Sequence, residues 1–167
     1  MVSVHPNPTG PAVPEPRLNV LLTGGRWRDE TWLSSLPALM APMGVRALRA
    51  GAADEAARLI REIPIHIAVV DLALPLLAQA PTAGDEGGLR VLGLIRRLDR
   101  PPPIIAVQRA ASGRDEAREL AEALELGAFA VVRRPVRIEH LLDAFQRVLH
   151  RIHADRWPNG PGPQHPS

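Results

Sequence analysis

One apolar run near the middle of the chain, Ile65–Pro75, constrains the fold more than any other stretch. Its centre is apolar and rich in β-branched residues, and the run meets a single carboxylate at Asp71. A short, uninterrupted apolar strand is typical of a parallel sheet that helices cover on both faces. Asp71 would then lie at the carboxyl end of the strand, where open α/β sheets bind ligands. The sequence predicts a functional carboxylate here; the alternative is an aspartate that only begins a loop.

Strand-like and helix-like patterns alternate along the chain on both sides of this run. Strict alternation indicates successive βαβ units and a parallel sheet. The pattern therefore predicts an α/β fold with a doubly wound five-stranded sheet of flavodoxin-like order 2-1-3-4-5, in which Asp71 lies at the topological switch point. The predicted strands are 18–22, 45–48, 65–71, 104–107 and 129–132, and the predicted helices are 29–40, 54–63, 88–99, 112–126 and 138–153.

Length and composition indicate one domain with a tail at each end. The 167 residues suit a single core, and residues 1–16 contain five prolines without apolar periodicity. We therefore predict a disordered arm over 1–16, a domain over 17–153 and a flexible tail over 154–167. The chain has no apolar run long enough for a membrane span and no signal-peptide pattern at its start, so we expect a cytoplasmic protein.

The basic and sulfur-containing residues exclude several kinds of chemistry. The chain has no cysteine, which rules out disulfides and thiolate sites, and all 20 basic residues are arginine. Mechanisms that need a lysine, such as Schiff-base formation or a P-loop, are therefore excluded. The net charge of +2 is also too small to predict nucleic-acid binding, which usually shows a concentrated basic stripe.

Three segments occur in an order and spacing that match one protein family. Val69–Pro75 contains an aspartate followed four residues later by proline, Gly88–Arg96 has the pattern of a third helix, and Gly127–Pro135 has the pattern of a last strand and its turn. Over residues 17–152 the chain thus resembles the CheY-like receiver domain of bacterial two-component response regulators. The resemblance implies a signalling domain, not an enzyme, with Asp71 at the phosphoacceptor position.

The chain departs from the family at most of the other functional positions. The resemblance implies an acidic pair that binds Mg²⁺, a serine or threonine that senses the phosphoryl group, a lysine that neutralises it, and a switch aromatic. The residues that neighbour or replace these parts here are Thr23, Gly24 and Gly25 for the acidic pair, Gln108 for the hydroxyl residue, Arg134 before Pro135 for the lysine, and Val131 for the aromatic.

These departures predict a degenerate receiver, a pseudo-receiver that acts without Mg²⁺-dependent phosphorylation. One carboxylate seldom binds Mg²⁺, and phosphoryl transfer depends on positioning and charge neutralisation, so we expect no cofactor. Asp29 and Glu30 lie too far along the chain to replace the acidic pair simply. Asp85 and Glu86, in the insertion over 76–87, are weak candidates for metal ligands beside Asp71 if that loop folds back.

The resemblance also implies a protein-interaction face made by the fourth helix, fifth strand and fifth helix. Its partner would be a histidine kinase, another signalling protein or a second copy of the chain, with no role for membrane. The residues expected at this face are Arg114, Arg118, Glu122, Val131, Arg133, Arg137 and Arg147.

Three alternatives to the pseudo-receiver remain open from sequence. The first is a phosphorelay receiver that is phosphorylated at Asp71 through a rearranged site containing Mg²⁺. The second is a nucleotide-binding α/β enzyme that uses Val20–Gly25 as its phosphate turn, although the full Gly-x-Gly-x-x-Gly pattern is missing. The third is a module that binds RNA or DNA through surface arginines. The lack of an aromatic platform argues against this alternative.

Overall fold

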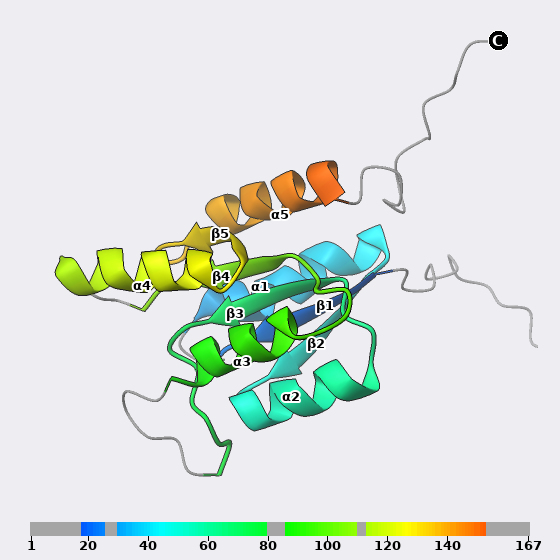
Figure 1. Cartoon of the computed structure of the whole chain (residues 1–167). Helices are drawn as coiled ribbons and strands as arrows, with labels where there is room; N and C mark the ends of the chain where they lie inside the picture. The colour runs from blue at the N-terminus through cyan, green and yellow to red at the C-terminus, as the bar shows by residue number, and fades with distance from the viewer. Residues whose placement is uncertain (1–17, 26–29, 80–85, 110–112, 153–167) are drawn as a thin grey trace, which may run out of the picture.

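The computed structural model describes residues 18–25, 30–79, 86–109 and 113–152. One parallel sheet with strand order β2-β1-β3-β4-β5 forms its centre, which confirms the predicted doubly wound fold (Figure 1). The strands are β1 (Leu18–Thr23), β2 (Val45–Ala50), β3 (Ile67–Asp71), β4 (Ile104–Val107) and β5 (Ala128–Val132).

Helices cover both faces of this sheet (Figure 1). The helices α1 and α5 pack on one face, and α2, α3 and α4 pack on the other, because each group shares a core cluster with alternate strand residues. All of β3 is buried, which explains why its sequence is apolar without interruption. The helical elements are α1 (Thr31–Met40), the 3₁₀ turn η1 (Ala41–Met43), α2 (Ala53–Glu62), α3 (Gly87–Arg96), α4 (Arg114–Glu125) and α5 (Ile138–Ile152).

Several helix boundaries differ from the sequence prediction, and two of these differences have a clear physical cause. The fourth helix begins at Arg114 after Gly113, whose φ of 70° is a left-handed conformation that glycine adopts freely. The predicted start at Ser112 lies outside the described residues. The third helix ends at Arg96 and not at residue 99, because the Leu98 N–H bonds to the Ile95 carbonyl in a tighter turn. Leu98 consequently leaves the helical phase and is partly exposed instead of facing the core.

The segment that follows β3 packs against the start of α2. The carbonyls of Pro75 and Leu76 accept hydrogen bonds from the backbone N–H groups of Ala53 and Asp54, at 2.9 and 3.1 Å. These bonds satisfy two donors that a helix N-terminus leaves without partners. Across the described ranges, no helix has the length and apolar character that crossing a membrane would require.

Candidate functional site

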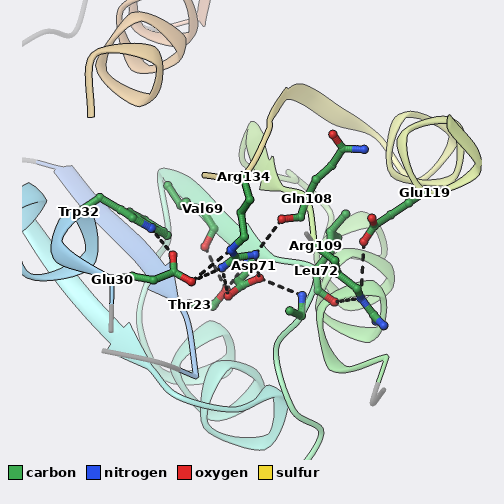
Figure 2. A network of polar contacts seen from close by, with 11 residues as sticks. Thr23, Glu30, Trp32, Val69, Asp71, Leu72, Gln108, Arg109, Glu119 and Arg134 are labelled. Carbon is green, nitrogen blue, oxygen red and sulfur yellow. Dashed lines mark hydrogen bonds and ion pairs between the residues drawn. The ribbon is translucent and has the colours of Figure 1, made fainter. Parts of the chain in front are cut away.

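The predicted site residue Asp71 lies at the carboxyl end of β3, at the switch point between β1 and β3 (Figure 2). Only 3% of the residue is exposed. Around it the structure brings together Thr23 from the end of β1, Gln108 from the end of β4 and Arg134 from the segment after β5. A buried carboxylate surrounded by three strand ends is the setting in which open α/β folds place functional groups.

Thr23 connects β1 to β3 beside Asp71. Its hydroxyl donates a hydrogen bond to the Val69 carbonyl at 3.2 Å and accepts one from the Asp71 N–H at 2.8 Å. The side chain is fully buried, so both bonds form away from water. Thr23 stands where the resembled family has an acidic residue. Here its two hydrogen bonds fix the backbone of the site.

The carboxylate of Asp71 is held by a two-pronged ion pair. Arg134 Nη1 donates to Oδ1 at 2.9 Å, and Nη2 donates to Oδ2 at 2.8 Å. The Ala73 N–H donates a further bond to Oδ1 at 2.8 Å. Because guanidinium and carboxylate are both planar, this paired arrangement is strong and sets the orientation of both groups.

Arg134 donates three further hydrogen bonds, which go to two acceptors besides Asp71. Nη1 also donates to the Gln108 carbonyl at 2.7 Å, and Nη2 and Nε donate to Glu30 Oε1 at 2.6 and 3.1 Å. Burial by itself would lower the pKa of Arg134, but the hydrogen bonds and charges of Asp71 and then Glu30 outweigh burial and raise that pKa. Arg134 therefore stays charged and anchors the site.

Glu30 also belongs to the site, although the sequence placed it too far along the chain to replace the acidic pair simply. It ends the connection between β1 and α1, and that connection begins at the same sheet edge as Asp71. One carboxylate oxygen binds Arg134, and the other accepts a hydrogen bond from Trp32 Nε1 (Figure 2). Glu30 thus pairs with the guanidinium. Its place directly before a helix at the carboxyl edge was the signal available in the sequence.

A second polar group, which sequence reasoning missed, joins the end of β4 to α4. Arg109 Nε donates to the Leu72 carbonyl at 2.9 Å and lies 3.5 Å from Glu119 Oε1. The side chain of Gln108 donates to the Glu116 carbonyl at 3.0 Å. Burial raises the pKa of Glu119, although the neighbouring Arg109 opposes that shift. These contacts connect the surroundings of Asp71 directly to α4.

The two glycines after β1 are used for packing. The Gly24 N–H donates to the Ala50 carbonyl at 3.1 Å, and a β-carbon at Gly24 would lie 2.6 Å from Leu33. A β-carbon at Gly25 would lie 3.0 Å from the Pro75 ring. A phosphate turn needs free N–H groups that point at the ligand, so this use of Gly24 weighs against the nucleotide-binding alternative.

The residues present do not fit a Mg²⁺ ion. Among the described residues no group of three or more acidic, histidine or cysteine side chains is placed to hold a metal. Both oxygens of Asp71 and one oxygen of Glu30 bind Arg134 instead. Glu86 is exposed at the start of α3, and Asp85 lies outside the described residues. An octahedral oxygen site is therefore not formed by these side chains.

The residues predicted for an interaction face lie on α4, after β5 and on α5. Val131 is half-buried and packs against the core on the α2–α3–α4 side. Arg133 pairs with Glu116 at 3.2 Å. Exposed pairs of this kind add little to stability, which leaves these side chains available to a partner. The exposed members of the set are Arg114, Arg118, Glu122, Arg133, Arg137 and Arg147.

Comparison with known proteins identifies the fold but no sequence family. The sequence matches no family model and no curated protein. A CheY-like receiver domain protein from Methanospirillum hungatei JF-1 is similar with a TM-score of 0.64 and 20% identity, covering 83% of this chain and 98% of that one. The receiver domain of a LuxO repressor protein from Vibrio parahaemolyticus has a TM-score of 0.61 and 23% identity, covering 86% and 98%.

A third solved structure shows a phosphorylated member of this fold. It is a response regulator from Burkholderia pseudomallei with a phosphorylated aspartic acid, a calcium ion and citrate, and it has a TM-score of 0.58 and 20% identity. The match covers 83% of this chain and 72% of that one. The class that fold and site define is therefore the CheY-like receiver fold, here with an arginine-bound aspartate at its switch point.

Proposed function

We propose that this chain is an atypical receiver-like signalling module that acts by protein contact and not by Mg²⁺-dependent phosphorylation. The observation that carries the proposal is the two-pronged ion pair between Asp71 and Arg134 at 2.8 and 2.9 Å. Both carboxylate oxygens are occupied by a cation that is part of the chain. The module would work in the cytoplasm as a non-enzymatic partner of a histidine kinase, another signalling protein or a second copy.

Phosphorylation of Asp71 would require this ion pair to open. One oxygen of Asp71 must be free to attack the donor, and a charge must be available to neutralise the transferred group. Opening a buried pair that has further hydrogen bonds costs about 3–5 kcal/mol, because each charge loses its partner away from water. The nearby carboxylate of Glu30 would add repulsion against an incoming phosphoryl group.

The polar network gives the module a route from the site to the proposed interaction face. Gln108 binds Arg134 through its carbonyl and α4 through its side chain, and Arg109 joins the carbonyl of Leu72 to Glu119 of α4. A partner bound at α4, β5 and α5 would therefore meet a surface whose position is set by the Asp71–Arg134 pair. In this proposal the pair holds one arrangement of that face without phosphorylation.

A second candidate function is a phosphorelay receiver with a rearranged site, and Glu30 favours it. The structure brings this second carboxylate to the guanidinium that binds Asp71. If a bound cation displaced Arg134, Asp71 and Glu30 would both become available as oxygen ligands, as hard cations require. The solved response regulator from Burkholderia pseudomallei carries both a phosphorylated aspartate and a divalent cation.

Incubation with acetyl phosphate and Mg²⁺, read by intact mass, separates the two candidates. Asp71→Asn is the control for the acceptor, and Glu30→Gln tests the rearranged metal site. The first proposal expects no gain of a phosphoryl group in the wild type while thermal unfolding shows an intact fold. A gain that disappears in both variants would overturn it and establish the phosphorelay function.

A further inference from the structure

An apolar groove separates α1 from α5 on the face of the sheet opposite α2, α3 and α4. Its volume is about 700 Å³. The amino-terminal ends of β1, β2 and β3 contribute Val20, Val45 and Ile67 to it. Its walls are formed by Leu39, Met40 and Met43 of α1 and η1 and by Leu142, Phe145 and Leu149 of α5. The groove lies outside the Asp71 site, and of the elements that form the proposed interaction face it contains only α5.

The exposure of Leu39 indicates that no apolar side chain of the described residues covers this edge of the groove. The helical pattern predicts that Leu39 faces the core with Trp32, Leu33 and Leu36, and those three are buried. Leu39 is instead 50% exposed, at the edge of the groove. Exposed apolar surface in a concave site is typical of a place where another apolar group binds.

The groove lies next to the point where the described part of α5 ends. Leu149 and His150, in the last turn of α5, line it, and α5 ends at Ile152 (Figure 1). Residues 153–167 contain a single aromatic side chain, Trp157. Five residues span up to about 17 Å, whereas the helical stretch from Leu142 to Leu149 is only about 10 Å long. Trp157 is therefore within reach of the whole groove.

We propose that Trp157 docks into the groove between α1 and α5, so that the segment after α5 forms an intramolecular strap. Proline at position 158 disfavours helical backbone at the residue before it, as a segment that has to turn back toward the groove requires. Covalent attachment over so few residues gives Trp157 a high effective concentration, which favours it over a second copy. The strap covers the apolar groove and leaves the α4–β5 face open.

Fluorine NMR of the full chain labelled with 5-fluorotryptophan tests this docking. The chain has three tryptophans, and Trp157→Phe assigns the signal of interest. The test variant is Leu39→Glu, which places a charge at the groove edge. The matched control is Leu77→Glu, because Leu77 is 52% exposed but lies in the segment after β3. Both positions are exposed enough that the substitution leaves the core intact.

We expect the Trp157 signal of the wild type to be insensitive to exchange of H₂O for D₂O, as for a buried ring. Leu39→Glu should make it sensitive, whereas Leu77→Glu should leave it unchanged. A Trp157 signal that is solvent-exposed in the wild type would overturn the proposal. Protection that survives Leu39→Glu would place the ring elsewhere, and protection that is lost on dilution would assign the groove to a second copy; either result also overturns it.

Discussion

Replacing Arg134 with methionine tests the ion pair at the centre of the site most directly. Methionine keeps much of the volume of the side chain but removes all of its donors. Asp71, which is 3% exposed, would keep the bond from the Ala73 N–H but no cation, and Glu30 would lose its ion-pair partner. A buried carboxylate without a neutralising cation is costly because it cannot be solvated.

The expected loss of stability is about 3–5 kcal/mol, as for other buried pairs from which one partner is removed. In a domain of this size that corresponds to a fall in the melting temperature of about 10–15 °C. The neighbouring Arg133 is the matched control because its side chain is 74% exposed and its ion pair lies at the surface. Arg133→Met should change the free energy of unfolding by less than about 0.5 kcal/mol.

A double-mutant cycle with Asp71→Asn decides whether the pair itself is responsible. Removing the carboxylate as well as the guanidinium eliminates the unpaired charge, so the double variant should be more stable than the sum of single losses by about 1–3 kcal/mol. A loss below about 1 kcal/mol for Arg134→Met, or additive effects in the cycle, would refute the view that this pair organises the site.

Three further predictions follow from single contacts around the site. Thr23→Val removes the hydroxyl that accepts from the Asp71 N–H and should cost about 1–3 kcal/mol in urea unfolding, whereas the exposed Thr31→Val should cost little. Gly88→Ala places a β-carbon 2.4 Å from the Asp71 carbonyl and should cost about 1–3 kcal/mol. Gly93→Ala in the same helix meets nothing and should raise the melting temperature; equal effects of the two substitutions would contradict the packing. Burial raises the pKa of Glu119 in the folded state above the ordinary value of 4.5. The folded protein therefore loses stability as the pH rises from about 4.5 through the folded-state pKa, and Glu119→Gln should remove this pH dependence from the free energy of unfolding.

The sequence by itself determined the fold class and the place of its central carboxylate. The apolar run that ends at Asp71, and the helical periods before and after it, required a buried parallel strand between covering helices. A parallel sheet places the carboxyl ends of its strands along one edge. Thr23, Asp71 and Gln108, at or directly after three such ends, therefore lie close together there. Periodicity suffices for this result because burial depends only on which face a side chain occupies.

Only the tertiary structure decided which charges pair at that edge. Arg134 lies 63 residues from Asp71 and 104 from Glu30. Asp71 ends a strand, whereas Arg134 and Glu30 come from connections between a strand and a helix. Glu119 and Arg109 likewise meet through the docking of α4. Sequence spacing does not set the direction of a connection. Whether a carboxylate meets a metal or a guanidinium depends on angstrom-scale positions that follow from the packing of the whole domain.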